Sequence, residues 1–225
     1  MNIVVTRERA SNEQLIKWLP PQASISEVPL TETRYQDLDE VRKKIAAAAN
    51  GQLFESLVVT SERTQRYLKV AREYVSEDAE VFSVGSSTTK SVELEGLTVR
   101  VQVIGRAKDL GNQVSRGPVL LLGARAMRTE LRDELVSRSM TTTMVDCYET
   151  VSADLSANDI AALKIAHVVV IGAPSGWKVA KDHVSEDTLV VVPGASTGEE
   201  VRVTHENVLE AWGPSLRDEV LKRIK

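Results

Sequence analysis

The apolar positions of the chain form short β-branched runs, separated by longer segments in which apolar residues recur at helical spacing. The runs are residues 3–6, 57–60, 81–84, 99–103, 119–122, 144–148, 168–171 and 189–192. Helices are predicted at residues 12–19, 38–49, 64–74, 88–95, 128–138, 157–164, 176–180 and 198–203. Ser156 with Asp159, and Ser215 with Asp218, resemble capping boxes at helix starts. This alternation is typical of βαβ units and predicts an α/β fold with parallel sheets.

The same pattern occurs twice along the chain. Three pairs of segments match, namely residues 57–61 with 168–172, 85–89 with 194–198, and 2–7 with 118–123. Their offsets are similar, at 111, 109 and 116 residues. The repeat predicts two similar domains. It leaves open where the chain crosses from one domain to the other, because the elements that close each domain are not assigned by the pattern.

Length and charge narrow the class of protein. A chain of 225 residues forms one large domain or two small ones, and the repeat favours two. A net charge of −4 argues against a nucleic-acid partner, because a duplex-binding surface needs clustered excess Lys and Arg. The longest apolar run, residues 168–171, is far below the ~20 residues of a membrane span. The first residues lack the features of a signal peptide, so we expect a cytoplasmic protein.

Familiar catalytic and cofactor motifs are missing. The sequence has no dinucleotide-binding or P-loop glycine motif and no zinc motif. Cys147 is the only cysteine, which rules out an internal disulfide, and its apolar neighbours favour inert packing. His167, His183 and His205 have no metal-ligand spacing and are expected to be ordinary histidines. Residues 172–176 approach the hydrolase elbow, but the Ser stands one place late, which favours a helix-opening turn. No cofactor or metal is predicted.

Ser, Thr and Gly are instead concentrated where the apolar runs end. At such positions a strand stops at a helix N-terminus, whose unpaired N–H groups and partial positive charge attract anions. Each of these residues is also explained as a simple helix cap. Their matching occurrence in both repeats favours a shared role, the binding of a polyanion held between two halves.

Several short motifs occur in a recognisable order. They are Val5-Thr6-Arg7, Val28-Pro29-Leu30, Val59-Thr60-Ser61, Val84-Gly85-Ser86-Ser87-Thr88, Tyr148-Glu149-Thr150, Ile171-Gly172-Ala173-Pro174-Ser175-Gly176, Pro193-Gly194-Ala195-Ser196-Thr197 and the closing residues 214–221. Together they resemble the uroporphyrinogen-III synthase family, whose repeats show a strand ending in Phe-Thr-Ser and a later Gly-x-x-Thr turn. The resemblance spans nearly the whole chain. Two departures are that Ile171-Gly172-Ala173 replaces the second Phe-Thr-Ser, and that Gly123-Ala124-Arg125 replaces an Arg-Gly-Glu, with Arg128 at a later Arg of that pattern.

The resemblance implies two α/β domains, each a parallel sheet flanked by helices, joined by a two-stranded linker. The first domain would combine residues 1–29 with 153–225, and the second would be residues 36–145. Linker strands would occupy residues 30–35 and 146–152. Ligand would bind at the carboxyl ends of the strands, where open α/β sheets place ligands.

The activity implied by the resemblance is that of a cyclising hydro-lyase. Its substrate is hydroxymethylbilane, a linear tetrapyrrole polycarboxylate, which is closed with inversion of the terminal ring. By resemblance, Tyr148 is either a general acid or a linker packing residue. The expected substrate-binding residues are Thr60, Ser61, Ser86, Thr88, Ser175, Gly176, Ser196, Thr197, Arg7, Arg125 and Arg128. We expect a monomer with a small-molecule substrate, no nucleic-acid or membrane partner, and more substrate carboxylates on the middle domain.

Two other classes of protein remain as alternatives. A paralogue that binds tetrapyrroles with little or no catalysis fits the lost hydroxyls of the second Phe-Thr-Ser. A methyltransferase or nucleotide enzyme on a doubly wound sheet needs a glycine-rich loop after its first strand, and Thr6-Arg7-Glu8-Arg9 does not provide one.

Overall fold

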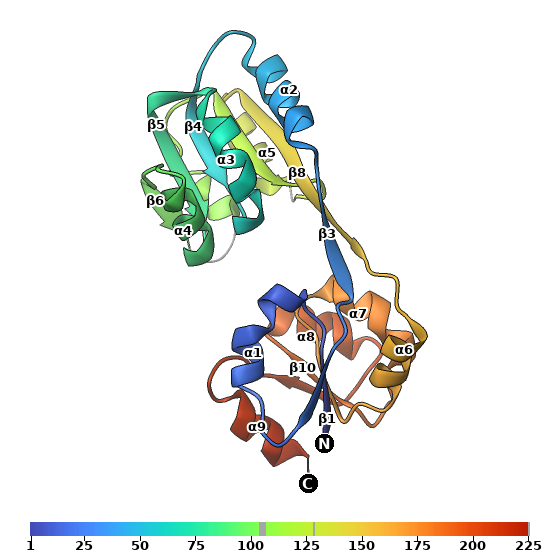
Figure 1. Cartoon of the computed structure of the whole chain (residues 1–225). Helices are drawn as coiled ribbons and strands as arrows, with labels where there is room; N and C mark the ends of the chain where they lie inside the picture. The colour runs from blue at the N-terminus through green and yellow to red at the C-terminus, as the bar shows by residue number, and fades with distance from the viewer. Residues whose placement is uncertain (104–106, 128, 225) are drawn as a thin grey trace. The chain divides into compact units, whose positions relative to one another are not determined.

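The computed structural model describes residues 1–103, 107–127 and 129–224, which form two compact units (Figure 1). Unit 1 consists of Met1–Glu32 and Thr150–Lys225, and unit 2 of Thr33–Glu149. The chain passes between the units twice, and both passages fall inside the segments expected as linkers. The finer domain limits given above stay predictions. No helix in the described part of the chain has the length and apolar character needed to cross a membrane.

Unit 1 contains a five-stranded parallel sheet, sheet A, in the order β11-β10-β9-β1-β2. Its strands are β1 (Asn2–Val5), β2 (Ser24–Glu27), β9 (Val168–Val170), β10 (Leu189–Val192) and β11 (Val208–Glu210). The flanking helices are α1 (Glu13–Lys17), α6 (Ala157–Lys164), α7 (Pro174–Ala180), α8 (Ala195–Arg202) and α9 (Leu216–Arg223), with short 3₁₀ turns at Arg9–Ser11 and Lys181–His183. Successive strand residues face opposite sides: Val4 and Val169 pack with α6, α7 and α8, whereas Ile3 and Val168 pack with α1 and α9.

Unit 2 contains a six-stranded sheet, sheet B, in the order β3-β8-β7-β4-β5-β6. Its strands are β3 (Thr31–Tyr35), β4 (Phe54–Val59), β5 (Val75–Val84), β6 (Val101–Val103), β7 (Val119–Ala124) and β8 (Thr142–Ser152). Its helices are α2 (Leu38–Ala49), α3 (Gln65–Arg72), α4 (Ser86–Leu94) and α5 (Glu130–Ser137), with 3₁₀ turns at Glu62–Thr64 and Ala107–Leu110. One core joins the sheet to α2, α3 and α4, and the other joins it to α5.

β3 makes sheet B mixed, whereas the pairs among β4 to β8 are parallel. The Gln36 amide donates to the Cys147 carbonyl at 2.9 Å, and the Ala153 amide donates to the Leu30 carbonyl at 3.0 Å. The partner's number falls as the chain number rises, so β3 and β8 run antiparallel. These two strands are the two-stranded connection between the units.

The two units share one strand order. Reading β11-β10-β9-β1-β2 beside β6-β5-β4-β7-β8 pairs β9 with β4, β10 with β5 and β1 with β7. These are the segments that match in sequence. Each half of the tandem repeat therefore contributes to both units: unit 1 joins the start of the first copy to the end of the second, and unit 2 joins the end of the first copy to the start of the second. This arrangement accounts for the crossover that the sequence pattern leaves open.

Most predicted elements are present. Two further strands, β2 and β11, are present without having been predicted from the sequence. β2 has a single apolar residue, Ile25, and β11 has three residues, so neither edge strand carries an alternation signal. The capping box of Ser156 and Asp159 is confirmed, with both reciprocal hydrogen bonds formed. The box at Ser215 is wrong: Ser215 already has helical φ and ψ angles, and its hydroxyl donates to Glu219 at 2.8 Å instead.

Candidate functional site

Both sheets have a topological switch point, where consecutive connections leave in opposite directions. In sheet A it lies between β1 and β9, and in sheet B between β4 and β7. The carboxyl ends of these parallel strands lie at one edge of each sheet, and ligands of open α/β sheets bind there.

Thr60 lies at the switch point of unit 2. Its Oγ1 donates to the Leu122 carbonyl at 3.2 Å, which closes the gap between β4 and β7. Gly123 is required beside it, because a Cβ there would lie 2.8 Å from Thr60 Oγ1 and 2.5 Å from Met127 Sδ. A hydroxyl has one proton to donate, so Thr60 is left with acceptor capacity only. Its predicted role as a carboxylate donor requires this bond to break.

Ser61 is better placed to donate. It caps the 3₁₀ turn at Glu62–Thr64, where its Oγ accepts from the Arg63 amide at 3.3 Å. Because the oxygen acts as the acceptor, the hydroxyl proton remains available to a ligand. Of the two neighbouring hydroxyls, Ser61 is therefore the stronger candidate for a carboxylate ligand.

The turn into α4 presents backbone donors. Gly85 stands before the helix with φ 82° and ψ 153°, and its own amide donates to the Val103 carbonyl at 2.8 Å. No side chain in the described part of the chain caps this helix, so the amides of Ser86, Ser87 and Thr88 form an uncapped first turn. The Ser86 side chain is exposed, whereas Thr88 is buried at 3% exposure. The turn offers amide donors, and of the two predicted hydroxyls, Ser86 is accessible and Thr88 is not.

Tyr148 lies on β8 close to these turns. The pairing of β7 with β8 shifts after Gly123, so that Ala124 pairs with Tyr148 and Cys147 is left as the extra residue of a bulge. A bulge re-aims the side chains that follow it, and both Cys147 and Tyr148 are buried in the same core cluster. The Arg63 guanidinium lies 5.8 Å from the centre of the Tyr148 ring. The ring is thus held by the core cluster and by the Arg63 guanidinium.

Arg125 is engaged by carboxylates of its own chain. Its guanidinium pairs with Glu149 at 2.9 Å and with Asp146 at 3.3 Å, and Asp146 also pairs with Lys44 at 2.7 Å. Burial opposes ionisation of Asp146, but hydrogen bonds from Lys44 and Arg125 hold its pKa below the ordinary value. The Arg125 amide donates to the Tyr148 carbonyl at 2.7 Å. These contacts hold β8 in place, and pairing of Arg125 with substrate stays a prediction.

Unit 1 has a different switch point. The Thr6 hydroxyl donates to the Val170 carbonyl at 2.6 Å, the counterpart of Thr60 but from the other strand of the pair. Arg7 packs its stem on Gly172, where a Cβ would lie 2.9 Å from Arg7 Cγ. Its guanidinium lies 5.9 Å from the Trp212 ring centre. The loss of the second Phe-Thr-Ser thus has a structural reason, because Gly172 makes room for an arginine.

The remaining predicted residues of unit 1 lie at the starts of α7 and α8. Ser175 is exposed, but Gly176 is buried against Leu30 and its amide donates to Ala173 at 3.0 Å. Ser196 is exposed, and Thr197 is buried at 5% exposure. Of the predicted residues of this unit, Ser175 and Ser196 therefore carry the accessible hydroxyls. Arg128 lies outside the described residues.

Three residues that were not predicted from the sequence lie beside Tyr148 in unit 2. They are Tyr35, Arg63 and Arg66, with the Tyr35 ring centre 6.4 Å from that of Tyr148 and the Arg66 guanidinium 5.0 Å from that of Tyr35. The available signal was the spacing of Arg63 and Arg66, which stand three residues apart and begin two positions after Ser61. Tyr35 and Tyr148 come from distant strands, so their contacts with these arginines carry no local signal.

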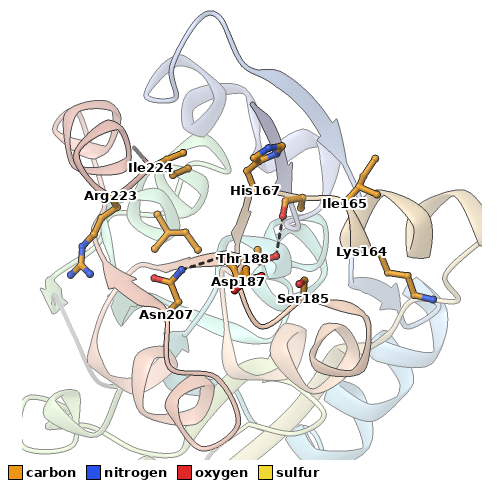
Figure 2. A pocket seen from close by; sticks show the side chains of 11 residues that line it. Lys164, Ile165, His167, Ser185, Asp187, Thr188, Asn207, Arg223 and Ile224 are labelled. Carbon is orange, nitrogen blue, oxygen red and sulfur yellow. Dashed lines mark hydrogen bonds between the residues drawn. The ribbon is translucent and has the colours of Figure 1, made fainter.

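A separate pocket of about 300 Å³ lies at the opposite, amino-terminal edge of sheet A (Figure 2). Its wall includes His167 and Thr188, which directly precede β9 and β10, and Asn207, which precedes β11. Thr188 Oγ1 donates to the Ala166 carbonyl at 2.9 Å, and Asn207 Nδ2 donates to the Asp187 carbonyl at 3.2 Å. The pocket is thus remote from the strand-end residues. Among the described residues, no group of three or more His, Cys, Asp or Glu side chains is arranged to hold a metal ion.

The chain is thus a two-domain protein of the doubly wound α/β class, with hydroxyl and amide donors at the carboxyl edge of each sheet. A family model described as uroporphyrinogen-III synthase HemD matches residues 22–215. This is most of the chain, and the chain belongs to the uroporphyrinogen-III synthase family, whose members are cyclising lyases of tetrapyrrole biosynthesis.

Solved structures agree with the fold. A mutant uroporphyrinogen III synthase from Thermus thermophilus aligns with a TM-score of 0.67 at 12% identity, covering 100% of this chain and 98% of that one. A uroporphyrinogen-III synthetase from Helicobacter pylori aligns with a TM-score of 0.66 at 16% identity, covering 98% and 96%. A search of curated proteins gives no match. The two-domain α/β fold expected from the sequence is confirmed.

Proposed function

We propose that this chain converts hydroxymethylbilane to uroporphyrinogen III, with loss of water and inversion of the terminal pyrrole ring. Family membership over residues 22–215 is the observation that carries the proposal. The hydroxyl and amide donors at the carboxyl edges of both sheets support it. A cytoplasmic location, a monomeric state and the absence of a nucleic-acid partner stay predictions.

The reaction requires positioning more than side-chain chemistry. Departure of the substrate hydroxyl leaves an azafulvene cation, and the substituted carbon of the terminal ring attacks it to give a spiro intermediate. That intermediate fragments and recloses with the ring reversed, and one water has left overall. Unaided closure gives the other isomer, so the enzyme must hold the substrate in a folded conformation. Holding reactants in the correct geometry can lower the barrier of a reaction by a large amount.

The donors of unit 2 suit this task. Ser61 retains a free hydroxyl proton, Ser86 is exposed, and the uncapped first turn of α4 adds amide N–H groups aligned with the helix dipole. In unit 1 the exposed Ser175 and Ser196 and the guanidinium of Arg7 are the corresponding groups. These groups can bind carboxylates although the net charge of the protein is negative, because each donor acts over a short distance.

Tyr148 is the candidate general acid. Its ring is held by the bulge and by Arg63, and its phenol would donate a hydrogen bond to the departing hydroxyl. A phenol is a weak acid, so its contribution is an assisted departure rather than a requirement. The chemistry then rests on many weak contacts, and no single side chain is indispensable.

The experiment is an isomer assay. Freshly made hydroxymethylbilane is incubated with the protein, and the type I and type III products are separated after oxidation. Type III product above the non-enzymatic background supports the proposal, and type I product alone refutes it. Ser86→Ala and Tyr148→Phe should slow formation of type III without abolishing it. Complete loss in either variant with the fold intact would contradict a reaction dominated by positioning.

A further inference from the structure

Two arginines and two tyrosines, Arg63, Arg66, Tyr35 and Tyr148, form a cluster in unit 2, of which the proposed function uses only a part. Arg63 faces the Tyr148 ring at 5.8 Å, Arg66 faces the Tyr35 ring at 5.0 Å, and the two rings are 6.4 Å apart. Tyr35, Arg63 and Arg66 line a cavity of about 370 Å³ together with Glu62, Gln65 and Glu95. This volume is within the range of small-ligand pockets, about 300–1,000 Å³.

The Arg66 guanidinium is held by ring faces. Besides Tyr35, it lies 5.6 Å from the centre of the Tyr67 ring, which is fully buried and donates its hydroxyl to the Gln36 carbonyl at 2.7 Å. A cation over a ring face keeps its in-plane N–H donors uncovered. Those donors match the two oxygens of a carboxylate in a bidentate arrangement.

Arg66 has no carboxylate partner among the residues that the structure describes. One acid of the cavity wall, Glu95, is engaged by other residues: it accepts from Gln65 Nε2 at 3.3 Å and pairs with Lys69 at 3.9 Å. Arg66 is thus a pre-positioned, exposed cation beside an exposed aromatic face, since Tyr35 is 45% exposed. Its uncovered N–H donors indicate that an anionic ligand binds here.

We propose that Arg66 and Tyr35, with Arg63, form a subsite for one carboxylate-bearing pyrrole ring of the substrate, adjacent to Tyr148. This inference rests on the proposed function and specifies where one ring binds. Hydroxymethylbilane carries eight carboxylates on four rings, hence two for each ring. Arg66 takes one carboxylate of the ring, and Tyr35 contacts its π face. The ring is then held next to the phenol that assists departure of the hydroxyl.

Arg66→Gln tests the subsite, with Arg72→Gln as the matched control on the same helix, an exposed position that does not line this cavity. Loss of a bidentate charge-assisted contact should raise KM for hydroxymethylbilane about tenfold and change kcat by less than about threefold. Arg72→Gln should leave both constants unchanged. Tyr35→Leu, which removes the π face that contacts the pyrrole ring, should also raise KM.

Direct binding of porphobilinogen, a single pyrrole with one acetate and one propionate arm, separates the two proposals. Ligand-detected NMR should show binding to the unmodified protein and to Arg72→Gln, and at least about tenfold weaker binding to Arg66→Gln. Unchanged KM and unchanged probe binding in Arg66→Gln overturn the subsite, even if type III product forms. Absence of type III product from the unmodified protein overturns the proposed function, whatever the probe does.

Discussion

Gly85 and Gly194 occupy matching positions of the two repeats but differ in backbone conformation, which makes a matched pair of substitutions. Each precedes a helix, α4 or α8, and an added Cβ at either position would meet nothing within 4 Å. Gly85 has φ 82° and ψ 153°, whereas Gly194 has φ 168° and ψ −178°, which is extended backbone. Any difference between Gly85→Ala and Gly194→Ala therefore reports backbone strain alone.

The magnitudes follow from the two conformations. The region of Gly85 is occupied almost only by glycine, and a side chain there costs about 1–3 kcal/mol. Replacing Gly by Ala also lowers the entropy of the unfolded chain, which stabilises a compatible site by about 0.4–1 kcal/mol. Gly85→Ala should thus destabilise unit 2 by about 1–2 kcal/mol net. Gly194→Ala should leave unit 1 as stable as before or slightly more stable.

Urea unfolding followed by two probes distinguishes the units. The three tryptophans, Trp18, Trp177 and Trp212, all belong to unit 1, so their fluorescence reports that unit, whereas far-UV circular dichroism reports both. With an m-value of about 2 kcal/mol/M, Gly85→Ala should lower the dichroism midpoint by about 0.5–1 M. Gly194→Ala should not lower the fluorescence midpoint. Equal midpoints for the two variants would refute the assignment of strain to Gly85.

Three further outcomes are expected. Tyr148→Phe should lower kcat for type III product several-fold, about 1 kcal/mol, because one hydrogen bond to the leaving hydroxyl is lost; an unchanged kcat would return Tyr148 to a packing role. Ser156→Ala should destabilise unit 1 by about 1 kcal/mol through loss of the capping box, whereas Ser215→Ala, which forms no cap, should have little effect in thermal unfolding. Burial raises the pKa of the Cys147 thiol to about 12, so the thiol is protonated throughout the neutral range and should react with iodoacetamide at pH 8 only after unfolding; rapid labelling of the folded protein would contradict its burial.

The central strands were predictable because burial on both faces leaves a strong signal. Val168–Val170 and Leu189–Val192 are continuous apolar runs, as expected of strands covered by helices on both sides. Ser24–Glu27 gives no such signal, since it is an edge strand whose hydrogen bonds to β1 decide its structure. The start of α9 was indicated by Ser215, but by the wrong mechanism, because the helical conformation already includes that residue.

The chemistry of the site was less predictable, because it depends on where each proton points. Thr60 and Ser61 are adjacent and similar in sequence, but the proton of Thr60 is bound to Leu122 and that of Ser61 is free to bind a ligand. Likewise, the sequence shows only that Gly172 stands where the family motif has a hydroxyl residue. In the structure, the side chain of Arg7 packs against this glycine. Such distinctions arise from contacts between segments more than 60 residues apart, which no local pattern encodes.

The repeat therefore preserves the fold while its two copies have diverged in chemistry. Unit 2 offers neutral donors, Ser61, Ser86 and the uncapped amides of α4, which bind a carboxylate by directed hydrogen bonds. At its switch point, unit 1 has exchanged such donors for Arg7, a full positive charge that lies over Trp212. Added salt screens exposed charges strongly and directed neutral hydrogen bonds weakly. The KM for hydroxymethylbilane should therefore rise with ionic strength through the contacts of Arg7 and of Arg66, and Arg7→Gln and Arg66→Gln should each remove part of that dependence.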